Sequence, residues 1–330
     1  MNSRQFLVFS FLGIIALAVF AISFNIYVDI YGLFRPARGR LLPICGEERV
    51  AKYLHSFRYL PDNFDGILLG SSVSDNLDTR AFAGHLVYNA SINGGNIEDV
   101  KPIAENVFRR REFALTIICV HRSLTNDHAH RTDLMTQKQY WGALGSPQLV
   151  TAYLSRAALR LGLGSSNYDE FGALHFGSGS DTRAVQKHID AAVAEIHMGT
   201  ARVGNYHIDP VALADLQSVI ELGRSHSRQT VIFYPPMPEA LLEASSADFS
   251  RYRESVSSLL DSNVMVVDFN GPEYASFRAN TANFIDAVHL SQPGAEFVIS
   301  ELRRAVDRRY TSQEAMLPSI PVTPSETDPK

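Results

Sequence analysis

Short apolar runs of strand length recur along the chain and alternate with stretches whose apolar positions have the spacing of a helix. The strand-like runs lie at residues 66–69, 86–88, 115–120, 230–234 and 264–269. Helices are predicted at residues 47–59, 96–111, 147–161, 182–197, 238–260 and 292–309, with another opened by the capping pair Asp209-Pro210. This alternation predicts an α/β fold, a three-layer α/β/α sandwich with a mostly parallel sheet.

The longest apolar run stands at the amino terminus, at residues 6–28, where only four small or polar residues interrupt it. As a helix it would reach about 34 Å, enough to cross a hydrocarbon core of about 30 Å. Residues 16–18 read Ala-Leu-Ala, which is similar to a signal-peptide cleavage site, but they lie inside the run. The pattern therefore favours an uncleaved signal anchor, one transmembrane helix over residues 1–28.

The remaining chain divides by composition into three parts. Residues 29–60 read as a juxtamembrane linker and helix, and residues 61–312 as the main domain. Within that domain, residues 121–208 have no strong strand signal and are predicted to be a mainly helical insertion near the ligand-binding edge of the sheet. The Pro-, Ser- and Thr-rich end, residues 313–330, is predicted to be a disordered tail.

Composition and charge narrow the function classes. The 330 residues are 45% hydrophobic and 20% charged, as in an ordinary globular protein, and the net charge is −5. No basic stripe marks a predicted helix, so a nucleic-acid partner is not expected. The two cysteines, Cys45 and Cys119, make no disulfide framework, and Cys119 is expected to be a buried thiol in a strand.

Candidate chemistry follows the first predicted strand. The strand at residues 66–69 ends in Gly70-Ser71-Ser72, and small residues there permit a sharp turn that exposes a hydroxyl at the ligand-binding edge of an α/β sheet. Far downstream, Asp286 stands three residues before His289. Serine, carboxylate and histidine form a catalytic triad by geometry rather than by chain order.

These blocks resemble the SGNH (GDSL-like) hydrolase superfamily, whose Ser, Gly, Asn and His come from four short blocks. Gly70-Ser71-Ser72 matches the first block, residues 89–94 (Asn-Ala-Ser-Ile-Asn-Gly) the second, and residues 286–289 the fourth. The third, usually Gly-x-Asn-Asp, departs: Asn126-Asp127 is a displaced version, or the oxyanion Asn is missing. The resemblance covers about residues 62–310 and implies a flavodoxin-like SGNH fold.

The resemblance also implies roles. Ser72 would be the nucleophile, His289 its general base and Asp286 the group that orients the imidazole. The backbone N–H groups of Gly94 and Ser72 would stabilise the oxyanion, with Asn126 as a further candidate.

Two more residues are candidates for contact with substrate. Asp75 either starts a helix or touches substrate, and Arg122 either binds substrate or replaces the missing oxyanion Asn. A metal site is an alternative interpretation of the histidines and carboxylates after the central strand, but polar surface beside a cleft is favoured, and no metal or cofactor is expected. These residues are His121, Asp127, His128, His130 and Asp133.

Three functions remain open. The first is a membrane-anchored serine esterase or O-acyltransferase acting on acyl, above all acetyl, esters of an extracytoplasmic polysaccharide or envelope polymer. The resemblance to SGNH proteins of polysaccharide O-acetylation implies a multi-pass O-acyltransferase as partner. The second is a lysophospholipase or thioesterase, and the third a non-catalytic assembly subunit. Tyr140 and Trp141, as carbohydrate-binding aromatics, would favour the first, whereas a long apolar tunnel would favour the second.

Orientation in the membrane rests on two opposed observations. Arg4 precedes the apolar run, whereas Arg35, Arg38 and Arg40 follow it, so the positive-inside rule alone favours a cytoplasmic domain. A single amino-terminal anchor ahead of a folded domain is the usual tether of an exported enzyme, and the membrane-bound members that this chain resembles work outside. We therefore expect a single-pass protein of the inner membrane with a periplasmic catalytic domain.

Overall fold

The computed structural model describes residues 2–36, 38–129, 134–163, 166–175, 181–201, 203–204, 206–261 and 264–314. Side chains are described as far as residue 308.

A five-stranded sheet forms the middle layer, and every pairing within it is parallel. Its spatial order is β2 (Val87–Asn89), β1 (Gly66–Leu69), β3 (Phe113–Cys119), β4 (Ser227–Tyr234) and β5 (Met265–Asp268). In the register of the central strands, Leu68 lies opposite Ile117, and Ile117 opposite Val231. The predicted α/β fold is confirmed, and each predicted strand corresponds to an observed one.

Helices cover both faces of the sheet, and each face has its own apolar core. On one face lie α2 (Glu48–Phe57), α4 (Ile97–Phe108), α8 (Pro210–His226) and α10 (Ser246–Ser257). On the other lie α7 (Thr182–His197), α9 (Glu239–Ala244), α11 (Ala275–Ala279) and α12 (Gln292–Glu314). Short elements complete the connections: α3 (Tyr59–Asn63) and the 3₁₀ turns η1 (Thr79–Ala81), η2 (Arg122–Leu124), η3 (Pro272–Tyr274) and η4 (Thr281–Asn283).

Capping residues set where two of these helices begin. The Asn96 side chain accepts a hydrogen bond from the Glu98 N–H, and Asp99 reaches back to the Asn96 N–H, which is a capping box at the start of α4. The Asp209 side chain caps α8 by accepting from the N–H groups of Val211 and Ala212, with Pro210 in the first turn. The single helix predicted over residues 238–260 is instead two. The chain breaks at Ser245, whose hydroxyl donates to the Leu241 carbonyl at 2.7 Å.

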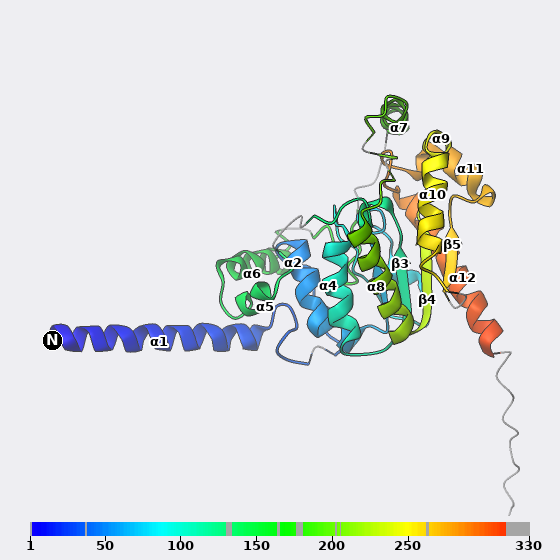
Figure 1. Cartoon of the computed structure of the whole chain (residues 1–330). Helices are drawn as coiled ribbons and strands as arrows, with labels where there is room; N and C mark the ends of the chain where they lie inside the picture. The colour runs from blue at the N-terminus through cyan, green and yellow to red at the C-terminus, as the bar shows by residue number, and fades with distance from the viewer. Residues whose placement is uncertain are drawn as a thin grey trace, which may run out of the picture.

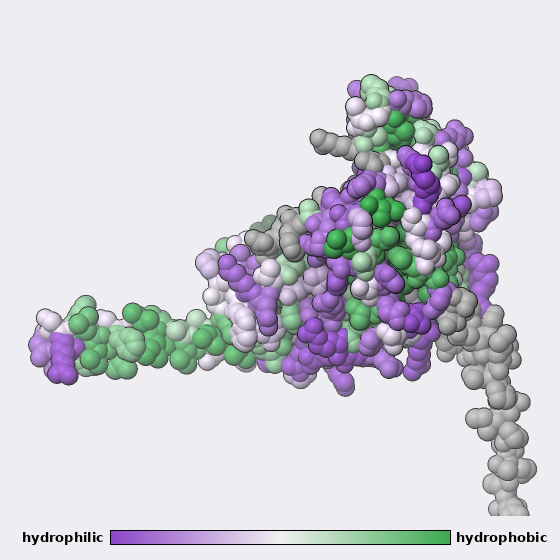
Figure 2. Space-filling model, viewed as in Figure 1, coloured by the Kyte–Doolittle hydropathy of each residue, from purple (hydrophilic) through white to green (hydrophobic). Residues whose placement is uncertain are grey.

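The amino-terminal helix α1 (Ser3–Val28) projects away from the sandwich (Figure 1). The mean hydropathy of its most apolar 18-residue stretch is 2.7, and none of that stretch is buried. Figure 2 shows its apolar surface against the largely hydrophilic body. The helix is long and apolar enough to cross a membrane, as the sequence predicts.

The carboxyl end of α1 is fixed to the rest of the protein by polar contacts. Asn25 is buried: its side-chain amide donates to the Leu144 carbonyl at 2.7 Å and accepts from the Tyr153 hydroxyl at 2.7 Å. Asp29 then ends the helix with a left-handed backbone (φ +46°), and its carboxylate accepts from the N–H groups of residues 33–35. Any membrane span is therefore joined to the domain through a defined turn.

The α-helices described within the predicted insertion lie in two separate places. Helices α5 (Gln137–Gly142) and α6 (Pro147–Arg160) lie beside the end of α1, whereas α7 packs against α9 on the far side of the sheet (Figure 1). Tyr140 packs on Phe34 and Phe57, so its ring belongs to the core around α2, while Trp141 is exposed. At the carboxyl end α12 continues to Glu314, and the rest of the predicted tail lies outside the described residues.

Candidate active site

The candidate nucleophile lies in a turn at the carboxyl end of β1. Gly70 makes this turn possible: a Cβ atom added there would collide with the Ser74 hydroxyl and would lie 2.8 Å from the Cβ of Cys119. Two residues later Ser72 is partly exposed, in contrast to Ser71 and Ser74, which are buried. Of the three serines in this turn, only Ser72 is thus presented to solvent, at the edge where parallel sheets bind ligands.

Ser72, His289 and Asp286 form one chain of hydrogen bonds, although Ser72 and His289 are 217 residues apart in sequence. The Nε2 atom of His289 lies 3.0 Å from Ser72 Oγ, and its Nδ1 atom lies 2.8 Å from Asp286 Oδ2. Both distances are within the range expected for a base and its orienting carboxylate. The structure therefore brings the three predicted triad residues together.

The loop between α11 and α12 orients the carboxylate of Asp286 and stabilises its ionised form. The other carboxylate oxygen of Asp286 accepts from the backbone N–H groups of Val288 and His289, each at 2.7 Å. Burial alone would raise the pKa of Asp286, but the hydrogen bonds from His289 and these N–H groups outweigh it, so the pKa is lowered. An ionised Asp286 at neutral pH can hold Nδ1 of the imidazole protonated, which leaves Nε2 to accept the serine proton.

Two asparagine side chains hold the nucleophile turn in place. The amide of Asn89 at the end of β2 donates to the carbonyls of Ser74, Asp75 and Leu77, at 2.8, 3.1 and 3.1 Å. The amide of Asn76 donates to the Leu290 carbonyl at 2.9 Å, which ties the nucleophile turn directly to the histidine loop. The distance between Ser72 and His289 is therefore set by fixed contacts on both sides.

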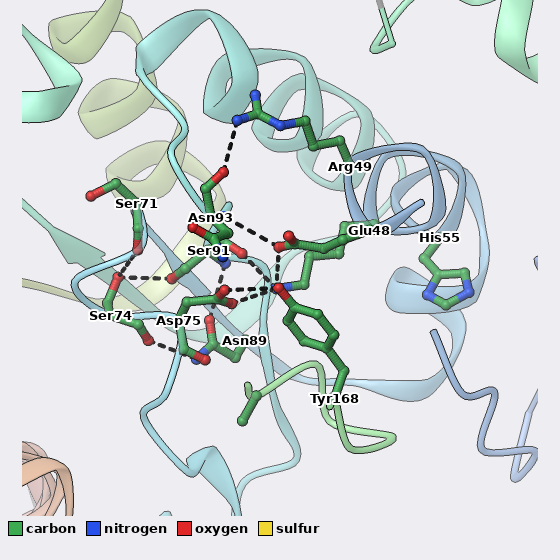
Figure 3. A network of polar contacts seen from close by, with 12 residues as sticks. Glu48, Arg49, His55, Ser71, Ser74, Asp75, Asn89, Ser91, Asn93 and Tyr168 are labelled. Atoms are coloured by element: carbon green, nitrogen blue, oxygen red, sulfur yellow. Dashed lines mark hydrogen bonds and ion pairs between the residues drawn. The ribbon is translucent and has the colours of Figure 1, made fainter. Parts of the chain in front are cut away.

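Asp75 lies in the protein interior, whereas one of the sequence hypotheses places it in contact with substrate, and that contact stays a prediction. Its carboxylate is fully buried in a polar network (Figure 3). There it pairs with the equally buried Lys52 of α2 at 2.7 Å and accepts from the Tyr168 hydroxyl at 3.1 Å. Lys52 also donates to the Ser91 carbonyl at 2.5 Å and lies 3.2 Å from Glu48. Asp75 anchors the turn that carries Ser72.

Lys52 and Asp75 need each other because both charges are buried. Burial raises the pKa of the Asp75 carboxyl, because it disfavours the charged form, whereas the adjacent Lys52 ammonium acts in the opposite direction. Sequence reasoning missed Lys52, which stands in α2 among apolar neighbours. A lysine at a core position of an amphipathic helix is the signal that would have found it.

Gly94 lies in the loop after β2, next to the nucleophile turn. A bridge between Ser71 and Ile92 extends the parallel pairing beyond the strands and brings the two loops together. Gly94 is exposed and has φ +61°, a conformation that favours glycine. Arg49 steadies this loop by donating to the Asn93 carbonyl at 2.7 Å and pairing with Asp99 at 2.5 Å. The role of the Gly94 N–H at an oxyanion stays a prediction.

Asn126, the further oxyanion candidate, lies apart from the cavity beside the triad. In the part of the chain that the structure describes, its side-chain oxygen is buried without a hydrogen-bond partner, and Asn126 does not line the cavity beside the triad. Its neighbour Asp127 accepts from the Asn96 amide at 3.0 Å, so this loop docks on the start of α4. Its use as an oxyanion donor also stays a prediction.

The described residues contain no cluster of histidine, cysteine, aspartate and glutamate side chains that could hold a metal ion. His128 contacts Asp215 and Glu98 at 3.0 and 2.8 Å, as a polar surface residue does. His121 Nδ1 lies 2.9 Å from the Ser123 hydroxyl, which in turn donates to Ser71 at 2.8 Å. His130 and Asp133 lie outside the described residues.

A narrow cavity adjoins the triad. Its walls include Val73, next to the nucleophile, and Ala287 and Val288, which separate Asp286 from His289. Val203, Gly204 and Tyr206 also line it, as do residues 235–237. His121 and Arg122, which follow β3 and Val120 in the chain, belong to the same lining. Arg122 is thus placed at the site, as one sequence hypothesis expects.

Comparison with known proteins gives structural likeness only. No protein-family model and no curated protein matches the chain. A solved structure from Streptococcus pneumonia, of a protein assigned as a platelet activating factor, covers 78% of this chain and 89% of its own, at 12% identity and a TM-score of 0.37. The lipase/acylhydrolase from Enterococcus faecalis covers 74% of this chain and 96% of its own, at 14% identity and a TM-score of 0.31.

The buried pair yields a stability prediction. Replacing Lys52 by Met leaves the Asp75 carboxylate buried and unpaired, so we expect a loss of about 3–5 kcal/mol in the free energy of unfolding, measured with urea. The control is Lys101→Met, which breaks a partly exposed pair with Asp215 and is expected to cost at most about 1 kcal/mol. Equal losses in the two variants would contradict a structural role for Lys52.

Proposed function

We propose that the chain is a membrane-anchored serine esterase or O-acyltransferase. The observation that carries the proposal is the hydrogen-bonded chain Ser72–His289–Asp286 at the carboxyl edge of a parallel sheet. A serine hydroxyl is a weak nucleophile at neutral pH, and an adjacent oriented base is what activates it. The same chain of contacts weighs against a non-catalytic assembly subunit, which has no need of this arrangement.

The reaction follows from these positions. His289 Nε2 accepts the proton of Ser72 as the serine oxygen attacks the ester carbonyl, and Asp286 stabilises the resulting imidazolium. The tetrahedral intermediate collapses, His289 returns the proton to the departing alcohol, and the acyl group stays on Ser72. Water or an acceptor hydroxyl then attacks the acyl carbon and gives its proton to His289. The bond between the acyl carbon and Ser72 Oγ breaks, and His289 returns the proton to Ser72. Water gives hydrolysis, and a sugar hydroxyl gives transfer.

Stabilisation of the intermediate is assigned to backbone groups. The N–H groups of Gly94 and Ser72 are the proposed oxyanion donors, and one such donor is typically worth about 3 kcal/mol. The glycine conformation at residue 94 and the contacts that Arg49 makes with its loop support a fixed backbone there. A preorganised donor needs no rearrangement at the moment of reaction.

The proposed substrate is an acyl ester, above all an acetyl ester, of an extracytoplasmic polysaccharide or envelope polymer. Support comes from the resemblance to polysaccharide O-acetylation proteins and from α1, which would hold the site near the inner membrane. A multi-pass O-acyltransferase in the same membrane is the proposed partner. The short cavity favours small acyl groups over the long chain of a lysophospholipid.

A serine substitution tests the mechanism. Ser72→Ala should lower the turnover of 4-nitrophenyl acetate by about 10³-fold or more, because nothing else supplies the nucleophile. The matched control is Ser71→Ala: its hydroxyl binds Ser123 rather than His289, so most activity should remain. Melting temperatures should stay close to that of the unaltered chain for Ser72→Ala. Undiminished turnover in this variant would rule out the proposed nucleophile.

Acceptor competition tests transfer against hydrolysis. Fixing an acceptor hydroxyl in near-attack geometry can outweigh the abundance of water. We expect slow release of acetate in isolation and, with oligosaccharides added, acetylated oligosaccharide in the mass spectrum. Free acetate alone with every acceptor tried would assign a plain esterase.

A fusion tests the topology. We expect α1 to span the inner membrane and the domain to lie in the periplasm, so an alkaline phosphatase joined after residue 310 should be active. A reporter that is active there only in the cytoplasm would reverse the orientation and agree with the arginines that follow α1.

A further inference from the structure

The cavity beside the triad has one cationic wall. Most of its lining is apolar and comes from residues such as Val203, Pro235, Met237 and Leu241. Arg122, at the start of the 3₁₀ turn after β3, brings a guanidinium to the same cavity. His121, Tyr206 and Ser245 are the other polar residues of the lining, and Arg122 is its one arginine or lysine. A charged group beside a mostly apolar lining restricts the kind of ligand that the cavity accepts.

Arg122 has no anionic partner in the part of the chain that the structure describes. The hydrogen bonds that it makes with described residues all go to its backbone carbonyl, which accepts from the N–H groups of Thr125 and Asn126 and from the Thr125 hydroxyl. Arg278 shows the usual alternative: it is buried, pairs with Glu239 at 2.8 Å and donates to the Phe269 and Gly271 carbonyls. The buried guanidinium of Arg278 thus has both a carboxylate and carbonyl acceptors, and Arg122 differs from it in this respect.

An unpaired cation in this position carries an energetic cost. Arg122 is only partly exposed, and burial lowers the pKa of its guanidinium. Tyr206 and Tyr252 act on the pKa of Arg122 in the opposite direction to burial, but neither tyrosine provides a carboxylate to pair with the guanidinium. Burying a charge is unfavourable unless a counter-charge arrives, and a guanidinium matches the two oxygens of a carboxylate or phosphate.

We propose that Arg122 binds a carboxylate or phosphate of the substrate and thereby makes the site selective for anionic esters. The inference rests on the proposed function, because it assumes that Ser72 attacks an ester beside this cavity. The anion belongs either to the acyl group, as in a half-ester of a dicarboxylic acid, or to the alcohol, as in an acetylated uronic acid. Arg122 is then a specificity residue and makes no contact with the reacting carbonyl.

Matched pairs of esters separate these sources. For the acyl side, the pair is mono-4-nitrophenyl succinate and its methyl ester, which differ in the negative charge and in one methyl group. For the alcohol side, the pair is an O-acetylated oligogalacturonate and its methyl-esterified form. The unaltered chain should have a higher kcat/KM for the charged member of at least one pair. The pair that shows the difference identifies the source of the anion.

Arg122→Gln then tests the residue. It should lower kcat/KM for the preferred charged ester by about 10- to 100-fold, mainly through KM, and change the neutral ester by less than about 3-fold. Arg251→Gln, an exposed position on α10, controls for the change in net charge and should leave both values unchanged. Arg122→Lys should restore part of the preference, since it keeps the charge without the fork.

Two results would overturn the inference. The first is an equal loss on charged and neutral esters in Arg122→Gln, which would assign Arg122 to the oxyanion. The second is no preference for charge in either pair with the unaltered chain. Hydrolysis of the neutral esters that depends on Ser72 would meanwhile keep the proposed function standing, so the two failures are distinguishable.

Discussion

The buried ion pair between Lys52 and Asp75 is the contact on which the site depends most. It joins α2 to the turn that carries Ser72, and through the Ser91 carbonyl it also holds the loop that leads to Gly94. Two charges without solvent contact are stable only while both are present and their remaining polar contacts are made. Here the Tyr168 hydroxyl contacts Asp75, and Glu48 contacts Lys52. The network therefore fixes the nucleophile side of the site in a single arrangement, and Asn76 transmits that arrangement to the histidine loop.

The same network lies between the proposed anchor and the chemistry. From the end of α1 the chain passes through the Asp29 turn into α2, the helix that supplies Lys52. Asn25 and Tyr153 hold α1 against the region of α5 and α6. A membrane span would thus be connected to the active site by packed helices and buried polar contacts. This arrangement would present the catalytic edge at a fixed distance from the bilayer, as suits an enzyme that meets its polymer at the membrane.

Much of the fold could be predicted because its signals are local. Each buried parallel strand is an apolar run, and the starts of α4 and α8 are marked by Asn96 and Asp209. Ser72, Asp286 and His289 could be proposed together because a glycine-serine turn and a carboxylate-histidine pair are short motifs. The burial of Asp75 could not be predicted from the sequence, because its partner Lys52 lies 23 residues away on another element. The break at Ser245 was missed for a similar reason: a side-chain contact with the backbone overrides the helical pattern there.

The central claim is that Ser72 carries the acyl group during turnover, and trapping the acyl-enzyme tests it most directly. The full-length protein would be mixed briefly with 4-nitrophenyl acetate, quenched in acid and digested, and its peptides analysed by mass spectrometry. We predict one acetyl group on the peptide that contains Ser72, assigned to that serine by fragmentation and absent from Ser72→Ala. In Asp286→Asn or His289→Gln, more acetyl-enzyme should accumulate only if the substitution slows deacylation more than it slows acylation. An acetyl group on another residue, with Ser72 unmodified during active turnover, would contradict the account.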